Sequence, residues 1–513
     1  MKITKKNIQK AIAYASLLRE KLLNDPYRPK FHFATPGDKG FPGDPNAAFY
    51  ANGKYHLMYL YHNFNDYYRY GHMVSTDLTH WSMLPDALIP DELDGGIFSG
   101  GAFVDDDGTV YVSYWALPVP GSPSMGGIRI AKSNDIAGDY AKWEKFAELA
   151  VPATEPGYAK ITENGKDVFI GAADPSNIWK ANGKYYMQAG ALVVLNLFRD
   201  KKDSPDEYKG DWTELFSSDD LREWKHEGRF YKRKTGKDYP DDSEDDMCPS
   251  FLPLPLSENG GEFSDKYLQL FIAHNKGCQY YIGSYDPYAK DRPFEIESHG
   301  RMSWNDFTFF APEALIAPDG RQIMWAWLHD DRHGEFEEHV VSGWAGVYSL
   351  PRSLWLKKDG SLGIAPISEL RGLRYDKTDD LSKVNPKCCE VTIEATVSPD
   401  AKIGLKIYFT RTEYVEVYYD KAENSLVFNA ARCVRGLNAK PVEKAPLNVS
   451  AGEKITLDIF VDRSVIEVFA NDSQAITRRA FWKNKSAPRL KPIKENAAIN
   501  NIAAWNIKET NLF

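Results

Sequence analysis

A short pattern that occurs twice constrains the fold of this chain more than any other feature. Asp44-Pro45 stands six residues ahead of the segment "ANGKYHLM", and Asp174-Pro175 stands six residues ahead of "ANGKYYMQ". Each copy places an acid before a predicted β-hairpin whose turn is Asn-Gly. The segments "STDLTHW" and "SDDLREW" form a second, weaker repeat in the same region. Repeated strand-rich units of this kind predict a β-propeller rather than a sandwich.

The rest of the chain divides around this predicted propeller, which covers residues 31–355 and would hold five blades of roughly 60 to 65 residues each. Apolar residues at helical spacing between residues 5 and 24 predict one amphipathic helix within an N-terminal extension, residues 1–30. Residues 356–379 are expected to connect two domains and to end in a short helical piece. Alternating apolar residues then predict a β-sandwich over residues 380–513. The predicted fold class is therefore all-β, a five-bladed β-propeller with a C-terminal β-sandwich, preceded by a short N-terminal helix.

Composition narrows the kinds of partner. The net charge of −9 argues against nucleic acid and against an anionic membrane surface, because both bind clustered Lys and Arg. No apolar run approaches the roughly 20 residues of a membrane span, and the N-terminus lacks the apolar core of a signal peptide. The five cysteines show no C-x-x-C spacing, which favours reduced thiols over disulfides or zinc. We therefore expect a cytoplasmic protein with a neutral ligand.

The two Asp-Pro motifs are candidates for chemistry, because a propeller brings the first strands of its blades to one axis. A single Asp beside Pro commonly caps a turn, which is the alternative for either residue alone. Hydrolysis of a glycosidic bond needs a carboxylate near the anomeric carbon and a protonated acid at the leaving oxygen. A third acid would come from the acidic run before "MCPSFLPLPL", which otherwise reads as a solvated loop and contains Asp241, Asp242, Glu244, Asp245 and Asp246.

The order of these motifs resembles glycoside hydrolase family 32, the invertases, levanases and inulinases, over nearly the whole chain after residue 28. The matching segments are "RPKFHF", "GDPNAAFYANGKYHLMYLY", "AADPSNIWKANGKYYM", "MCPSFLPL" and, most specifically, "VDRSVIEVFANDSQAITRRAF". The resemblance implies that Asp44 is the nucleophile, that Asp174 stabilises the transition state and that Ser99 contacts sugar. It also implies a small carbohydrate substrate and no metal or organic cofactor.

Four departures from the family pattern predict a remodelled sugar pocket. Phe41-Pro42-Gly43 replace Trp-Met-Asn before the nucleophile, Leu60 replaces Gln, Ala173 replaces Arg, and Met247 replaces the Glu that donates the proton. A bulge could bring a nearby acid into the vacated place, and we expect Glu244, with Asp245 and Asp246 as alternatives. The residues expected to bind substrate are Phe41, Asn46, Leu60, Phe98, Ser99, Ala173, Met247 and Glu313.

The leading hypothesis is a retaining glycosidase that cleaves a β-fructofuranosyl or similar furanosyl linkage in short oligosaccharides. One alternative is a glycosidase for an unusual furanoside, such as a difructose anhydride or an arabinofuranoside. Another is a carbohydrate-binding propeller without catalysis, which the loss of the proton donor at Met247 favours.

Other residues receive weaker assignments. His56 and His72 are expected to be core or rim histidines rather than metal ligands. Glu467 is expected in the sandwich or at a domain contact, and Trp304 and Phe307 to Phe310 are possible platforms for a sugar ring. Glu313 could equally cap a strand. The N-terminal helix is expected to pack on the propeller or on a second subunit, so a homo-oligomer is possible.

Overall fold

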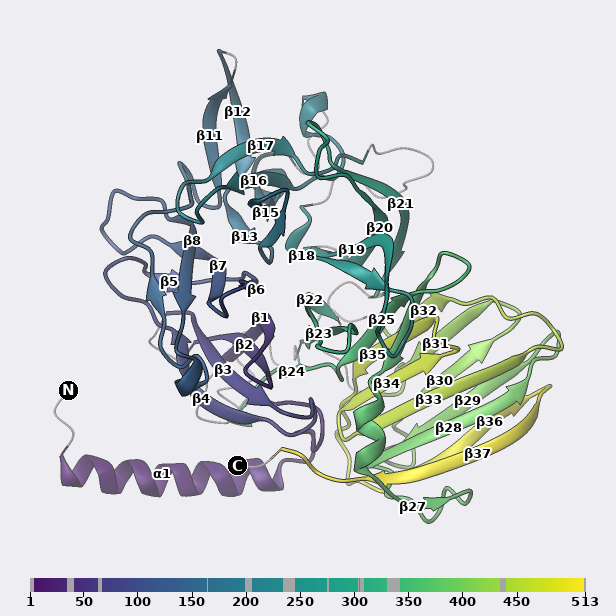
Figure 1. The fold of residues 1–513 in the computed structure, drawn as a ribbon. Helices are drawn as coiled ribbons and strands as arrows, with labels where there is room; N and C mark the ends of the chain where they lie inside the picture. Colours follow the sequence, from purple (N-terminus) through teal and green to yellow (C-terminus); the bar gives the residue numbers. More distant parts are fainter. Residues whose placement is uncertain are drawn as a thin grey trace.

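The computed structural model describes residues 4–34, 41–62, 67–163, 165–198, 205–233, 245–274, 276–302, 304, 309–329, 342–433 and 440–511. Over these residues, five antiparallel sheets surround a common axis, and a two-sheet sandwich lies beside them (Figure 1). The predicted five-bladed propeller, C-terminal sandwich and N-terminal helix are confirmed.

Each blade is one sheet that extends outward from the axis (Figure 1). The first blade contains β1 (Phe41–Ala51), β2 (Lys54–His62), β3 (Arg69–Ser75) and β4 (Ser82–Leu88). The second contains β5 (Gly96–Ile97), β6 (Ala102–Val104), β7 (Val110–Leu117), β8 (Gly127–Ser133), β9 (Glu144–Lys145) and β10 (Val151–Pro152). The third contains β13 (Ala173–Pro175), β14 (Trp179–Ala181), β15 (Lys184–Gly190), β16 (Glu214–Ser218) and β17 (Lys225–Arg229). The fourth contains β18 (Met247–Pro255), β19 (Phe263–Ala273), β20 (Gly277–Tyr285) and β21 (Phe294–Arg301). The fifth contains β22 (Phe310–Ile316), β23 (Gln322–Leu328), β24 (Val347–Tyr348), β25 (Arg352–Leu356) and β26 (Leu362–Pro366).

Smaller elements lie between and within the blades. A hairpin of β11 (Tyr158–Glu163) and β12 (Lys166–Gly171) leads into the third blade. Short helical turns occur at η1 (Ile136–Gly138) in the second blade, at η2 (Val194–Phe198) and η3 (Asp206–Tyr208) in the third, and at η4 (Ser368–Leu373) after the fifth.

The two Asn-Gly pairs form the predicted hairpin turns. Asn52 and Gly53 have φ of 50° and 73°, and Asn182 and Gly183 have φ of 50° and 74°. Two successive residues with positive φ define a type I′ turn, whose twist suits a two-residue hairpin and which Asn-Gly favours. The repeat therefore marks the same local structure in the first and third blades.

Helix α1 (Lys5–Asn24) has the predicted bounds and begins at Thr4, whose hydroxyl accepts the backbone N–H of Asn7 at 3.3 Å. It extends away from the body of the protein (Figure 1). Leu22 is buried, whereas Ile12 is 62% exposed and Leu17 is 68% exposed. Most of the apolar surface of α1 thus lacks cover from the described part of its own chain. Within these described residues, no helix has both the length and the apolar character needed to cross a membrane.

The sandwich consists of two sheets that face each other across a core of aliphatic side chains. One sheet contains β27 (Arg374–Thr378), β28 (Cys388–Thr396), β33 (Lys454–Asp462), β34 (Val465–Ala470), β35 (Gln474–Arg479) and β37 (Ala498–Ile507). The other contains β29 (Lys402–Tyr408), β30 (Tyr414–Asp420), β31 (Ser425–Asn429), β32 (Val442–Pro446) and β36 (Arg489–Glu495). The connector is shorter than the expected 356–379, because β26 completes the fifth blade and β27 already pairs with β37.

A buried polar cluster joins the two domains, and it includes the two acids of the "VDRSVIEVF" segment. The imidazole of His32, just before the propeller, contacts Asp462 at 3.0 Å and Glu467 at 3.1 Å, and all three side chains are fully buried. Glu467 also accepts Nη2 of Arg352 at 2.9 Å and the backbone N–H of Leu350 at 2.7 Å. Burial opposes ionisation of Glu467, but Arg352 and His32 outweigh it and lower the pKa of Glu467 to about 2. The prediction of a domain contact at Glu467 is confirmed.

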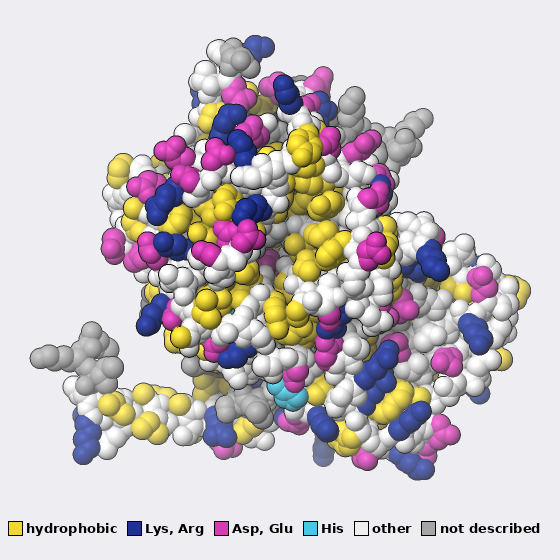
Figure 2. All heavy atoms as spheres, viewed as in Figure 1, with side chains coloured by type: hydrophobic (Ala, Val, Ile, Leu, Met, Phe, Trp, Pro, Cys, Tyr) yellow, Lys and Arg dark blue, Asp and Glu magenta, His cyan; other side chains and the backbone are white. Residues whose placement is uncertain are grey.

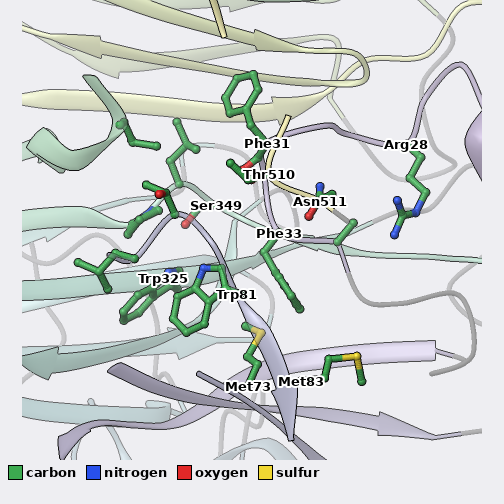
Figure 3. Close-up of a pocket in the computed structure, with 16 residues that line it drawn as sticks. Arg28, Phe31, Phe33, Met73, Trp81, Met83, Trp325, Ser349, Thr510 and Asn511 are labelled. Carbon is green, nitrogen blue, oxygen red and sulfur yellow. Dashed lines mark hydrogen bonds between the residues drawn. The ribbon is translucent and has the colours of Figure 1, made fainter. Parts of the chain in front are cut away.

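The same junction encloses a small cavity lined by Phe31, Phe33, Trp81 and Trp325 (Figure 3). Its volume is about 70 Å³, well below the roughly 300–1,000 Å³ of a small-molecule site. Phe33 and Trp81 fill the space between the N-terminal segment and the first blade, so this cavity is a packing void rather than a sugar pocket.

Candidate active site

Each blade presents one polar or thiol side chain at the propeller axis. Asp44 comes from β1, Asp174 from β13, Cys248 from β18 and Glu313 from β22, while Ser99 lies just before β6. In the view of Figure 2, hydrophobic side chains gather around the hollow at the centre of the blades. Asp44 and Cys248 are partly exposed, whereas Asp174 is 6% exposed. The structure thus brings together the two predicted catalytic carboxylates.

Irregular backbone aims these side chains. The pairing register shifts in the first strand of four blades, at 42–45 and 46–49 in β1, 173–175 in β13, 247–250 in β18 and 310–313 in β22. Asp174, Cys248 and Ala311 have φ of 40°, 48° and 46°, and each stands directly before a proline. Positive φ in a residue other than glycine is strained, and such strain and bulges concentrate at functional sites. The chain therefore spends stability on the orientation of these residues.

A single thiol connects the two carboxylates. Sγ of Cys248 donates to Oδ2 of Asp174 at 3.3 Å and to Oδ2 of Asp44 at 3.6 Å. The hydroxyl of Ser99 also donates to Oδ2 of Asp44. Burial, with the two nearby acids, raises the pKa of the Cys248 thiol well above its usual value. The thiol therefore remains a neutral donor and is not a nucleophile.

The acids of this site hold protons more tightly than free carboxyls do. Burial first, and then the charge of Asp44, raises the pKa of Asp174 to about 7. Burial also raises the pKa of Asp44, against the opposing hydrogen bonds from Ser99 and Cys248. Two adjacent carboxyls that cannot both ionise readily are typical of catalytic pairs.

Side-chain hydrogen bonds close the seams between blades around these acids. Oε1 of Glu313 accepts the backbone N–H of Ala48 at 2.7 Å, which links the fifth blade to the first. The amide of Asn46 donates to the carbonyl of Asp44 at 2.9 Å and accepts the N–H of Gly100 at 3.0 Å, which links the first blade to the second. Asn46 is 2% exposed and holds the backbone of Asp44, the predicted nucleophile, while its expected contact with sugar stays a prediction. Burial raises the pKa of Glu313 well above its usual value, against the hydrogen bond from Ala48.

Three more residues expected to bind substrate lie beneath the site. Leu60 is 4% exposed, Ala173 is 0% exposed and Met247 is 1% exposed. They replace polar groups of the family pattern with buried apolar packing, and their contact with sugar stays a prediction. Phe98 is partly exposed, and its ring centroid lies 4.7 Å from that of Tyr68. The side chain of Phe41 lies outside the described residues.

Neither Asp245 nor Asp246 is available as a direct acid/base. Both side chains are fully buried. Asp246 accepts the hydroxyl of Tyr231 at 2.6 Å, and Asp245 accepts the ring Nδ1 of His274. The prediction for these two acids is therefore wrong, because neither is exposed to solvent. Glu244, the favoured acid, lies outside the described residues, as do Asp241 and Asp242.

Among the weaker assignments, the two histidines are confirmed and two of the aromatic sugar platforms are not. His56 and His72 are buried and bond to each other through Nδ1 and Nε2 at 3.0 Å, which confirms them as core histidines. No group of three or more potential metal ligands occurs among the described residues. Trp304 packs against the sandwich core, and Phe309 is 1% exposed under Arg352, so these two are not sugar platforms.

Two residues that the sequence analysis did not single out belong to this region. Cys248 precedes Pro249 as Asp44 precedes Pro45 and Asp174 precedes Pro175, so its equivalence to the acids was visible in the sequence. His274 carried no such signal, because its place depends on the pairing of β18 with β19.

Two neighbouring carboxyls at the centre of a five-bladed propeller define a site of the glycosidase type. Residues 32–366 match the family model described as "Glycosyl hydrolases family 32 N-terminal domain", and residues 369–506 match "Glycosyl hydrolases family 32 C terminal". The chain belongs to glycosyl hydrolase family 32, so the resemblance and the prediction of a glycosidase are confirmed.

Similar proteins cover nearly the whole chain. A sucrose-6-phosphate hydrolase of Zymomonas mobilis is 27% identical over 99% of this chain and 97% of its own length. A levanase of Bacillus subtilis is 26% identical over 93% of this chain and 69% of its own length. Among solved structures, fructan 1-exohydrolase IIa from Cichorium intybus superposes with a TM-score of 0.76 and 20% identity, covering 94% of this chain and 98% of that one.

The raised pKa of Asp174 predicts how stability depends on pH. Between the ordinary pKa of Asp and about 7, the folded protein keeps a proton that the unfolded chain releases, so stability falls as pH rises through this window. Asp174→Asn removes this loss. We expect the free energy of unfolding in urea to rise in the variant, relative to the wild type, by on the order of 4 kcal/mol between pH 4 and pH 8.

The matched control is Asp105→Asn in the second blade. Hydrogen bonds from Tyr185, the backbone and Lys180 outweigh burial and lower the pKa of Asp105, so its contribution is lost as pH falls. As pH rises, the free energy of unfolding of Asp105→Asn should fall slightly relative to the wild type, which is the opposite of the change in Asp174→Asn. A constant difference between the wild type and Asp174→Asn across this pH range would contradict the assignment.

Proposed function

We propose that this chain hydrolyses a β-fructofuranosyl linkage with retention of configuration, through a covalent intermediate on Asp44. The observation that carries this proposal is the placement of Asp44 and Asp174 on a shared thiol donor at the propeller axis. The sucrose-6-phosphate hydrolase and the levanase support the fructosyl group as the unit transferred.

The hydrogen bonds of Asp44 favour one oxygen as the attacking atom. Ser99 and Cys248 both donate to Oδ2, which fixes the carboxylate plane and leaves Oδ1 for the anomeric carbon. Two donors on one oxygen also lower the pKa of Asp44 against its burial, which favours the ionised nucleophile.

The free oxygen of Asp174 supports its role beside the sugar. Oδ2 accepts the Cys248 thiol, whereas Oδ1 is buried and has no hydrogen-bond partner among the described residues. A buried polar atom without a partner is costly unless a ligand completes it. Sugar hydroxyls would satisfy this oxygen and would be oriented by it as positive charge develops on the ring.

A second substrate class is also supported, because buried apolar residues, Leu60, Ala173 and Met247, stand where the family pattern has polar ones. A pocket with fewer polar contacts suits an unusual furanoside, such as a difructose anhydride or an arabinofuranoside. Hydrolysis rates across a panel of fructosides and arabinofuranosides would rank the two classes.

Replacement of the nucleophile tests the proposal. Asp44→Asn should lower kcat on β-fructofuranosyl fluoride by at least about 10³-fold, because the activated leaving group needs little protonation but still needs the nucleophile. Asp105→Asn, the same change outside the site, should retain wild-type turnover. Full activity in Asp44→Asn would contradict the proposal, and a wild type inert toward the whole panel would favour a binding protein without catalysis.

We also propose a cytoplasmic homo-oligomer. All five cysteines are described as free thiols, including the adjacent Cys388 and Cys389, which suits a reducing compartment. Helix α1 carries five basic residues and one acidic residue in a chain of net charge −9, so a second copy offers it complementary charge as well as apolar cover.

Helix α1 gives this second proposal its test. Ile12 is exposed in the single chain, so Ile12→Glu should not disturb the fold but should shift sedimentation of the full chain to the monomer. Ala13→Glu, on the same helix, is the control for added charge. An unchanged sedimentation coefficient in Ile12→Glu would rule out α1 as the contact.

A further inference from the structure

The site described above lacks a proton donor at the place where the family pattern has one. Met247 occupies that position and is 1% exposed. Cleavage of an unactivated glycoside needs an acid at the leaving oxygen and then a base for water. The inference below names that group, and it rests on the proposed function.

The pairing of β18 with β19 places an imidazole beside the vacated position. Met247 pairs with Ile272, so the strands, followed two residues further, set Asp245 opposite His274. Asp245 accepts the backbone N–H of His274 at 3.2 Å and also its ring Nδ1. A carboxylate that accepts at Nδ1 fixes the tautomer and leaves Nε2 as the nitrogen that exchanges protons.

Exposure separates the two members of this pair. The side chain of Asp245 is 0% exposed and that of His274 is 41% exposed. The imidazole is therefore held from behind by a buried carboxylate while its other side stays accessible. This is the arrangement in which a histidine serves as acid and base with a carboxylate that orients it.

His274 also lies close to both catalytic carboxyls. Its charge lowers the pKa of Asp44 and that of Asp174, while Asp245 raises the pKa of Asp174. The ring centroid of His274 is 6.0 Å from that of Phe310, the first residue of β22. The imidazole thus stands between the fourth and fifth blades, within electrostatic range of both acids.

Two tyrosine hydroxyls and one thiol near the acids are already engaged in hydrogen bonds. Tyr70 donates its hydroxyl to the carbonyl of Phe98 at 2.7 Å, and Tyr348 donates to that of Gly43 at 3.0 Å. The Cys248 thiol donates to the two acids themselves.

We propose that His274 is the catalytic acid/base of this site and that Asp245 is its positioning residue. In the first step Oδ1 of Asp44 bonds to the anomeric carbon, the glycosidic C–O bond breaks, and protonated Nε2 gives its proton to the leaving oxygen. In the second step neutral Nε2 takes a proton from water, the water oxygen bonds to the anomeric carbon, and the ester bond to Asp44 breaks. The enzyme returns with its proton on Nε2.

The test compares His274→Ala and His274→Gln with the wild type on two substrates, a fructosyl oligosaccharide and β-fructofuranosyl fluoride. Hydrolysis of the oligosaccharide should fall by about 10²- to 10⁴-fold. Release of fluoride in the first turnover should be nearly unchanged, and added azide should restore turnover by forming β-fructofuranosyl azide. The Gln variant retains a donor toward Asp245, so it separates loss of the proton donor from loss of folding.

A matched control exists on the surface, where Nδ1 of His80 contacts Oδ2 of Asp77 at 2.7 Å, and both side chains are substantially exposed. His80→Ala should leave both activities unchanged. Asp245→Asn should shift the alkaline limb of the pH–rate profile toward lower pH, because the imidazolium that faces Asp245, Asp44 and Asp174 loses one negative neighbour. A change in folding alone would lower the rate without moving this limb.

Oligosaccharide hydrolysis within about threefold of wild type in both His274 variants would overturn the proposal. Azide rescue in Glu244→Gln instead would also overturn it and would assign the donor to Glu244. In either case, activity of the wild type and inactivity of Asp44→Asn on the fluoride would leave the proposed function standing. Failure of the wild type on every furanoside would overturn both.

Discussion

The central constraint in this protein is the placement of two carboxyls, Asp44 and Asp174, against one neutral thiol at the propeller axis. Two buried negative charges at such a place repel each other and lose hydration, so the rest of the fold must hold them there. Burial and the charge of Asp44 raise the pKa of Asp174 to about 7, which is the direction that this cost predicts. Every blade contributes to the restraint, because every seam between blades carries hydrogen bonds near the axis.

The seams use the same device with different residues. Asn46 bonds to Gly100, the hydroxyl of Ser113 donates to the carbonyl of Ser176 at 2.6 Å, and Asn177 exchanges two hydrogen bonds with the backbone of Phe251. Cys278 donates its backbone N–H to Phe309, and Glu313 closes the ring at Ala48. Register shifts in the strands nearest the axis let these groups meet. Outside the ring, the cluster of His32, Asp462 and Glu467 fixes the sandwich to the segment before the first blade and, through Leu350 and Arg352, to the fifth blade.

The two acids of this site keep polar surroundings, whereas several neighbouring positions have become apolar. The nucleophile and its partner acid keep polar, strained surroundings, while Leu60, Ala173 and Met247 place apolar packing where the family pattern has polarity. Without a carboxyl at residue 247, no acid at that position can protonate the leaving oxygen. The imidazole of His274, backed by the carboxylate of Asp245, lies two residues along the paired strands and offers one. In our proposal the chemical class is retained while a different group moves the proton.

Much of this was predictable from the sequence, for identifiable reasons. The Asn-Gly turns and the helix at residues 5–24 depend on local conformational preference, so their positions were predicted correctly. The pairing of Asp44 with Asp174 followed from a repeat, which encodes equivalent places in different blades. The burial of Asp245 and of Asn46 was not predictable, because it depends on which neighbour each side chain finds after the ring closes. His274 lies 29 residues from Asp245 in the chain, and only strand pairing brings them together.

Peptide mass after acid quenching during turnover tests the central claim most directly. Wild-type protein hydrolysing β-fructofuranosyl fluoride would be denatured in acid within the steady state and digested with pepsin. The account predicts that the peptide containing Asp44 carries one fructosyl unit and that no such peptide forms in Asp44→Asn. A fructosyl unit on any other residue, or turnover with no covalent adduct, would contradict it.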